Sequence, residues 1–155
     1  MALRARLGLW VYGAAGGVYV LDQLTKAMVV RTLRGRPPIR IVPGVVDLNY
    51  TENAGGAFGL FGGQPWLFFG ATLAVSVVIV IASLRVSDWV TAVALGLILG
   101  GALGNLTDRI LRGPGVSGRV VDFIDFHIWP VFNLADCAIV VGALVMVAAG
   151  LRRQE

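Results

Sequence analysis

The clearest pattern in this sequence is the alternation of long apolar segments with shorter polar stretches. Four segments stay apolar over about 20 residues, the length that a helix needs to cross the hydrocarbon core of a bilayer, roughly 30 Å thick. They cover about residues 7–30, 66–84, 89–107 and 131–151, and the second and third contain no charged residue. The pattern therefore predicts an all-α membrane protein with four transmembrane helices.

The polar stretches between these segments predict how the chain is arranged across the membrane. Two are long, at about 31–65 and 109–130, and the third is a short turn around Ser87 and Asp88. Because successive crossings alternate sides, both long stretches lie on one face and both termini on the other. Five arginines fall on the termini side and seven on the opposite side, so the positive-inside rule does not orient the protein.

The first long stretch predicts a small β structure. Residues 39–51 mix β-branched residues with partial alternation and contain a Pro43-Gly44 turn, which indicates two short strands. We expect this β cradle to cover about residues 38–62 and to lie at the membrane surface.

Composition supports a membrane protein built as one domain, residues 1–155. The chain is 57% hydrophobic and only 14% charged, and its mean hydropathy is +0.80; a soluble domain of this size is far more polar. Arg4 and Arg6 before an apolar run, with Ala14 and Ala15, imitate a cleavable signal peptide. The apolar run continues to Leu21, so we interpret it as a retained helix. The net charge of +4 suits membrane phospholipids, and nothing indicates nucleic acid.

Glycine spacing predicts close helix contacts. Gly96, Gly100 and Gly104 recur every four residues on one face of the third segment, and Gly13 and Gly17 do so in the first. Small residues at this spacing let two helix backbones approach. We expect a compact bundle.

Charged residues at the ends of the apolar segments are the candidates for chemistry, because a charge inside a bilayer is costly unless it is paired or functional. Asp22 and Lys26 are four residues apart, in the order that favours an ion pair on one helix face. A structural salt bridge and a catalytic role are both open for this pair. Asn105, Asp108 and Arg109 stand at i, i+3 and i+4, so they share one face and predict a polar network.

Two aspartates near the last segment are the strongest catalytic candidates. Asp122 sits in an apolar run just outside the membrane, and Asp136 lies three residues after Asn133 on the opening turn of the last helix. Two carboxylates in a partly dry site tend to share a proton, leaving one as general base and one as general acid. That pair can activate water for peptide hydrolysis. Asp125 is a rival for Asp122, although the two face opposite ways in a strand.

Five short blocks carry a resemblance to a known family. They are Asp-Gln-Leu-Thr-Lys at 22–26, Asn-Tyr-Thr-Glu-Asn-Ala-Gly-Gly-Ala-Phe at 49–58, Gly-Asn-Leu-Thr-Asp-Arg at 104–109, Val-Asp-Phe-Ile at 121–124 and Phe-Asn-Leu-Ala-Asp at 132–136. In this order they resemble the signature blocks of bacterial lipoprotein signal peptidase, the type II signal peptidase. The blocks extend over most of the chain.

The resemblance implies a four-helix bundle with an extracytoplasmic β cradle in the bacterial inner membrane, a monomer with both termini cytoplasmic. It implies an aspartic endopeptidase without cofactor or metal that cuts diacylglyceryl-modified prolipoproteins before the lipidated cysteine and binds globomycin-type inhibitors. The catalytic residues would be Asp122 and Asp136. The supporting polar shell would be Asp22, Lys26, Asn53, Asn105, Asp108, Arg109 and Asn133. A glycine-rich segment with Gly55, Gly56 and Gly59 would form a flap over the substrate.

Other chemistries have little support in the sequence. One histidine, His127, and one cysteine, Cys137, do not make a usual zinc site. A Ser-Lys dyad would need a serine near Lys26, and Ser117 is the only serine on the expected side. A proton-coupled transporter should place its acids near the bilayer centre, whereas here they gather at one face. A non-catalytic scaffold stays as a third possibility.

Overall fold

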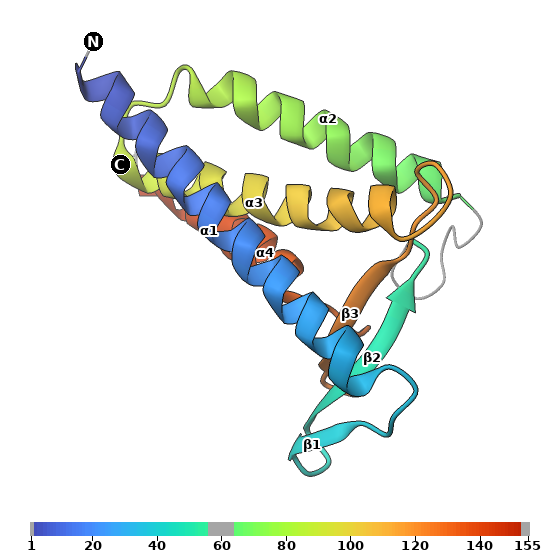
Figure 1. The fold of residues 1–155 in the computed structure, drawn as a ribbon. Coiled ribbons are helices and arrows are strands. Elements are labelled where there is room, and N and C mark those ends of the chain that lie inside the picture. The colour runs from blue at the N-terminus through green and yellow to red at the C-terminus, as the bar shows by residue number, and fades with distance from the viewer. Residues whose placement is uncertain (1, 56–63, 153–155) are drawn as a thin grey trace.

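A computed structural model describes residues 2–55 and 64–152, without the side chains of residues 2–5. It contains four helices and three strands over these residues. In chain order they are α1 (Ala2–Leu33), β1 (Ile39–Val42), β2 (Val46–Asn53), α2 (Pro65–Ser83), α3 (Trp89–Leu111), β3 (Val120–Asp125) and α4 (Leu134–Arg152). Both termini lie at the end of the bundle away from the sheet (Figure 1).

The helices have the lengths and compositions that the apolar segments predict. By these two criteria α2, α3 and α4 are each long and apolar enough to cross a membrane. Helix α1 is the longest at 32 residues, and its charged residues Asp22 and Lys26 are fully buried inside the protein. The predicted fold class, a four-helix membrane bundle with a small β structure, is confirmed.

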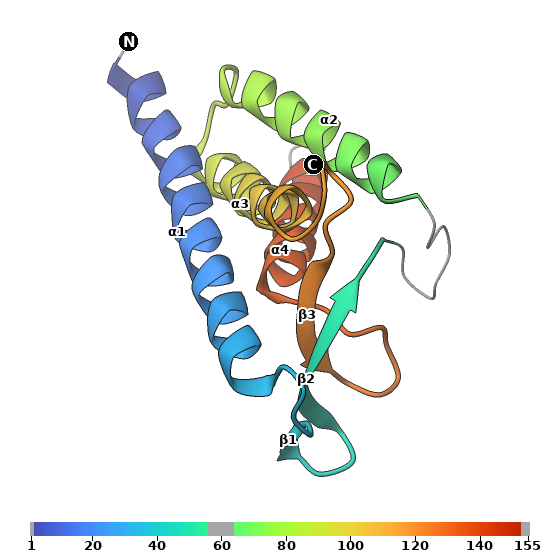
Figure 2. The ribbon, with the colours of Figure 1, turned by 45° about the vertical axis from the view of Figure 1, so that its right-hand side comes forward.

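Helix α3 is the centre of the bundle and packs against α1, α2 and α4 (Figure 2). Its glycines make this possible, because a Cβ atom at Gly96 or Gly100 would collide with the backbone of α1 at Val11 or Ala15. The predicted contact face of α3 is therefore confirmed. The same prediction for Gly13 and Gly17 is wrong: neither has a neighbour that a Cβ would meet, because α1 turns a different face toward α3.

The sheet is antiparallel with strand order β1-β2-β3. The first two strands are the predicted pair, joined by a turn in which Gly44 has φ +75° and Val45 N–H donates to the Val42 carbonyl at 2.9 Å. Proline followed by a left-handed glycine is the signature of a type II turn. The second long stretch adds β3, which pairs with β2 and brings residues far apart in the sequence together.

The sheet lies across the ends of the helices and packs against the last turns of α1 (Figures 1 and 2). Its apolar contact with α1 consists of Val121 and Phe123 from β3 against Val29 and Leu33. The predicted glycine-rich flap is only partly visible, since Gly56 and Gly59 lie outside the described residues. This arrangement places β3 beside the ends of α3 and α4.

Candidate active site

A cleft of about 360 Å³ lies between the helix ends and the sheet. It is lined by polar side chains at its base and by aromatic and aliphatic side chains from α2, α4 and the chain before α4. The lining residues are Asn53, Phe68, Thr72, Asn105, Arg109, Asp122, Trp129, Pro130, Val131, Phe132, Asp136 and Ile139. Both predicted catalytic aspartates are among them.

Asp122 reaches the cleft from the middle of β3. The residue is 2% exposed, and its carboxylate accepts two amide hydrogen bonds, from Asn53 at 2.9 Å and from Asn133 at 2.6 Å. Asn53 ends strand β2, so pairing of β2 with β3 delivers this donor. The side chain of Asn53 is itself fixed, because its oxygen accepts the backbone N–H of Gly55 at 2.8 Å.

Asp136 reaches the cleft from the first turn of α4, and a reciprocal cap holds it there. The Asn133 side chain accepts the Asp136 N–H at 3.0 Å, and Asp136 Oδ2 accepts the Asn133 N–H at 3.2 Å. This is a capping box, which satisfies backbone donors at the start of a helix. The second oxygen, Oδ1, accepts the Asn105 amide at 2.8 Å.

Asn133 connects the two aspartates. Its Nδ2 atom donates to Asp122 and, at 3.1 Å, to the side-chain oxygen of Asn105. The amide nitrogen of Asn105 in turn donates to Asp136. Asn133 is fully buried. The three amides of Asn53, Asn105 and Asn133 therefore fix both carboxylates with neutral donors, which add no charge to the cleft.

Lys26 is a buried hub behind the cleft. Its ammonium lies 2.9 Å from Asp22, 3.0 Å from Asp108 and 2.9 Å from the oxygen of Asn105. An ammonium group has three N–H donors, and three acceptors are present. Because Lys26 binds the oxygen of Asn105, the amide nitrogen of Asn105 is turned toward Asp136.

The two acids that bind Lys26 each hold the backbone next to a cleft aspartate. Asp108 accepts the N–H of Val121 at 3.2 Å, one residue before Asp122. Asp22 accepts the N–H of Ala135 at 3.0 Å, one residue before Asp136. The salt bridge between Asp22 and Lys26 thus forms as the spacing predicts, and its place in the structure is to position the strand and the helix that carry the aspartates.

Arg109 brings a positive charge to the cleft wall. It is 6% exposed, its guanidinium lies 5.5 Å from the ring centre of Phe68, and its buried Nη1 has no hydrogen-bond partner among the described residues. A buried donor without a partner is costly. Arg109 therefore offers a ready hydrogen bond to an oxygen atom that enters the cleft.

Burial and the neighbouring carboxylate change the acidity of Asp122, which lies outside the membrane-spanning helices. Removal from water raises its pKa, and the charge of Asp136 raises it further, while hydrogen bonds from Asn53 and Asn133 act in the opposite direction; together they raise the pKa of Asp122 to about 7. Asp122 is therefore partly protonated near pH 7.

The rival aspartate lies elsewhere. Asp125 is the partner of Asp47 across the sheet and accepts the backbone N–H of His127 at 2.8 Å, and it does not line the cleft. Cys137 is a free thiol on α4. No group of three histidine, cysteine or acidic residues that could bind a metal occurs in the described part of the chain.

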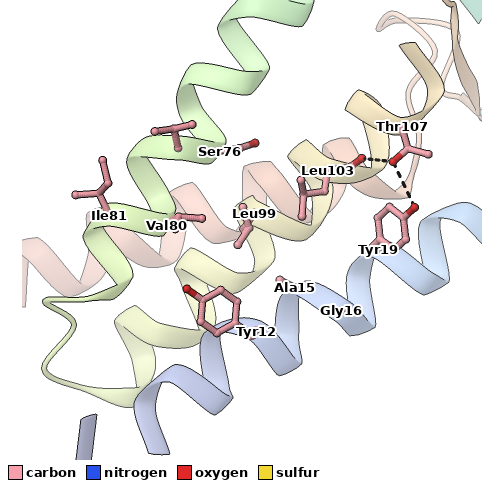
Figure 3. A pocket seen from close by; sticks show the side chains of 11 residues that line it. Tyr12, Ala15, Gly16, Tyr19, Ser76, Val80, Ile81, Leu99, Leu103 and Thr107 are labelled. Carbon is pink, nitrogen blue, oxygen red and sulfur yellow. Dashed lines mark hydrogen bonds between the residues drawn. The ribbon is translucent and has the colours of Figure 1, made fainter. Parts of the chain in front are cut away.

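A larger cavity of about 640 Å³ lies between α1, α2 and α3, apart from the cleft (Figure 3). Leu99, Leu103 and Val80 form much of its surface. Its polar atoms are hydroxyl groups such as that of Thr107, which donates to the Leu103 carbonyl at 2.8 Å and lies 3.3 Å from the hydroxyl oxygen of Tyr19. Its lining contains no carboxylate, so it cannot supply the acid-base pair.

Some site residues have no clear signal in the sequence. Phe68 and Thr72 line the cleft from an uncharged apolar helix, where nothing separates them from residues that face lipid. Arg112 binds Asp108 at 2.6 Å, and its spacing of four residues from Asp108 is a usable signal. Gln23 donates to Asp22 and to the Gly104 carbonyl.

Comparison with known proteins agrees with this geometry. The family described as Signal peptidase (SPase) II matches residues 14–152. A lipoprotein signal peptidase of Rhodococcus jostii is 43% identical over 148 residues, 92% of this chain and 73% of that protein. Another, of Syntrophomonas wolfei, is 42% identical over 147 residues, 89% of this chain and 92% of that protein.

The fold has a solved counterpart as well. A structure described as a bacterial membrane enzyme superposes with a TM-score of 0.78 at 29% identity, covering 92% of this chain and 87% of the other. The protein is therefore a multi-pass membrane enzyme. It belongs to the signal peptidase II family of aspartic peptidases.

Proposed function

We propose that this protein removes the signal peptide from diacylglyceryl-modified prolipoproteins by cutting before the lipidated cysteine, with water activated by Asp122 and Asp136. The single observation that carries the proposal is the pair of carboxylates facing one cleft and joined through Asn133. The names of the related lipoprotein signal peptidases support the substrate class. The whole chain, residues 1–155, acts as one peptidase domain.

In this mechanism the two aspartates share one proton, and Asp122 holds it. Burial and the charge of Asp136 favour the protonated form of Asp122, which leaves Asp136 as the partner that acts as the base. Asp136 takes a proton from water as the water oxygen attacks the scissile carbonyl carbon. Asp122 gives its proton to the carbonyl oxygen.

Collapse of the tetrahedral intermediate completes the reaction. Asp136 passes its proton to the leaving nitrogen as the C–N bond breaks, and Asp122 recovers a proton from one hydroxyl of the intermediate. The products are a carboxylic acid on the signal peptide and a free amine on the lipidated cysteine. Both aspartates then return to their starting protonation states.

The remaining cleft residues bind and position. Arg109 has a buried donor without a partner among the described residues, and we infer that it holds a backbone carbonyl of the substrate. Phe68, Thr72 and Ile139 come from α2 and α4, so the cleft is bordered by two helices that cross the membrane, and a lipidated peptide would enter between them. A globomycin-type cyclic peptide would compete for the same cleft.

We propose that the termini face the cytoplasm and that the sheet and the cleft lie at the extracytoplasmic face of the inner membrane. Both termini lie away from the sheet (Figure 1), as an even number of crossings requires. A cleft at this face would meet a substrate whose lipidated cysteine lies at the outer surface of the membrane.

The test is cleavage of a diacylglyceryl-modified prolipoprotein peptide by purified protein in detergent. Asp122→Asn and Asp136→Asn should each abolish cleavage while the protein stays folded, and Asp125→Asn, which alters an acid outside the cleft, should retain it. If the folded wild type fails to cut the lipidated peptide, the substrate is wrong. If either cleft variant keeps its activity, the catalytic pair is wrong.

A further inference from the structure

The hairpin made by β1 and β2 exposes a row of aliphatic side chains. Ile39, Ile41, Val42 and Val45 are 49%, 54%, 46% and 51% exposed. Strand β1 is also an edge of the sheet, with β2 as its neighbour on one side. An exposed, apolar edge strand in water invites aggregation, so proteins normally cover or charge it. We therefore expect these side chains to contact an apolar surface outside the described chain.

The position of the hairpin points to the membrane as that surface. Ile39 is the register partner of Leu48, so both side chains project from one face of the sheet. On that face Leu48 packs against the cluster that contains Val29 and Leu33, from the last turns of α1. The hairpin follows α1 directly and extends beyond its end (Figures 1 and 2). Its aliphatic side chains therefore lie beside the end of α1, near where that helix would leave a bilayer.

Arginines surround these aliphatic side chains. Arg31, Arg36 and Arg40 are exposed and make no ion pair within the described parts of the chain. By contrast, Arg34 and Arg119 both lie near Glu52, at 3.4 and 3.9 Å. A guanidinium group binds phosphate oxygens through two parallel hydrogen bonds. Three free guanidinium groups beside exposed aliphatic residues therefore fit the phosphate groups of a lipid surface.

We propose that the β1–β2 hairpin is a second membrane-binding element, in which Ile39, Ile41, Val42 and Val45 enter the interface and Arg31, Arg36 and Arg40 bind the phosphates of anionic phospholipids. Apolar insertion combined with basic charge is the usual basis of interfacial binding. The proposal also gives a role to three of the seven arginines on the sheet side of the chain. It concerns lipid binding and does not depend on the peptidase reaction.

The depth of the hairpin is measured with nitroxide labels in nanodiscs of equal parts phosphatidylcholine and phosphatidylglycerol. Cysteine is placed at Ile41→Cys or Val45→Cys in a Cys137→Ala background, with Ser117→Cys in the loop between α3 and β3 as the control. Labels at 41 and 45 should collide more often with oxygen, which concentrates in the bilayer, than with a water-soluble nickel chelate. If both behave like the label at 117, the hairpin lies in water and the proposal fails.

A second experiment tests the arginines. It compares the lipids that copurify with wild-type and variant proteins from the same mixed bilayers. Phosphatidylglycerol should be enriched over phosphatidylcholine with the wild type, and the enrichment should fall by about fivefold for each arginine lost in Arg31→Gln, Arg36→Gln and Arg40→Gln. Arg85→Gln with Arg152→Gln, at the opposite end, should leave it unchanged. The assignment of the three arginines is wrong if their variants keep the wild-type enrichment of phosphatidylglycerol, or if the control variant loses as much of it. Peptide cleavage in detergent verifies that each variant is folded.

Discussion

The Nδ2 atom of Asn133 lies 2.6 Å from Oδ1 of Asp122. The oxygen of the same side chain caps α4 by accepting the N–H of Asp136. One amide therefore orients a strand residue and a helix residue that together form the proposed catalytic pair. Rotation of this amide would break both contacts. The cap of α4 and the orientation of Asp122 in the cleft therefore depend on the same side-chain conformation.

We expect Asn133→Ala to lower kcat for lipidated peptide cleavage by about 100-fold, the order found when one oriented donor is removed from an active site. The variant loses the donor to Asp122 and the cap of α4 at the same time. Asn49→Ala, which alters an asparagine on β2 outside the cleft, is the matched control and should keep normal activity. Steady-state kinetics in detergent decides, and unchanged kcat in Asn133→Ala would contradict the assigned role.

Lys26→Met should destabilise the protein by about 3–5 kcal/mol, because removal of one partner leaves buried charges without compensation. Asp22 and Asp108 would both lose their ammonium partner. Thermal unfolding in detergent measures the effect, with the exposed Arg85→Met as control. Adding Asp22→Asn and Asp108→Asn should recover part of the stability without recovering activity. A variant with wild-type thermal stability would show that Lys26 is not a buried hub.

Activity should fall as pH rises above about 7. Asp122 must be protonated to act as the general acid, and its pKa is raised to about 7. Above that value, each further pH unit lowers the protonated fraction of Asp122 about tenfold, and the rate falls with it. The pH profile of kcat/KM measures this alkaline limb. In Asn53→Ala the limb should move to higher pH, because the lost hydrogen bond lowers the pKa of Asp122 in the wild type. A shift to lower pH would refute the argument.

Two glycine substitutions distinguish the effect of a helix–helix contact on stability from the effect of helix propensity. Gly96→Ala should destabilise the bundle by about 1–3 kcal/mol, because its Cβ would collide with Val11 and Ala14 and the helices would have to move apart. Gly13→Ala places its Cβ in open space and should leave stability unchanged or raise it by about 0.5–1 kcal/mol. Thermal unfolding of both variants tests this, and equal losses would place Gly13 in a contact after all.

The sequence predicts α2, α3 and α4 because a long apolar segment is enough to indicate a membrane span, whereas α1 also contains charged residues that are buried inside the protein. It also predicts the i, i+4 pair of Asp22 and Lys26, since both lie on one helix. Glycine spacing was informative for α3 and misleading for α1, because the same spacing occurs whether a face packs against a helix or faces outward. Gly96 and Gly13 look alike in the sequence and differ only in the bundle.

Contacts between segments far apart in the chain could not be predicted from the sequence. The pairing of β2 with β3, which brings Asn53 to Asp122, joins residues 69 positions apart. The bonds from Ala135 to Asp22 and from Val121 to Asp108 involve backbone N–H groups, which carry no residue-specific signal. Family resemblance selected these side chains in advance, but their partners appear only in the folded chain.

The two backbone anchors have a consequence for how the protein is made. Asp22 belongs to the first helix and holds α4, the last, while Asp108 near the end of the third helix holds β3. During synthesis the first three helices enter the membrane before Asp136 exists, and Asp122 has no partner until α4 follows. With Asp122 and Asp136 as the proposed catalytic pair, the nascent chain would lack peptidase activity until the final helix has been inserted.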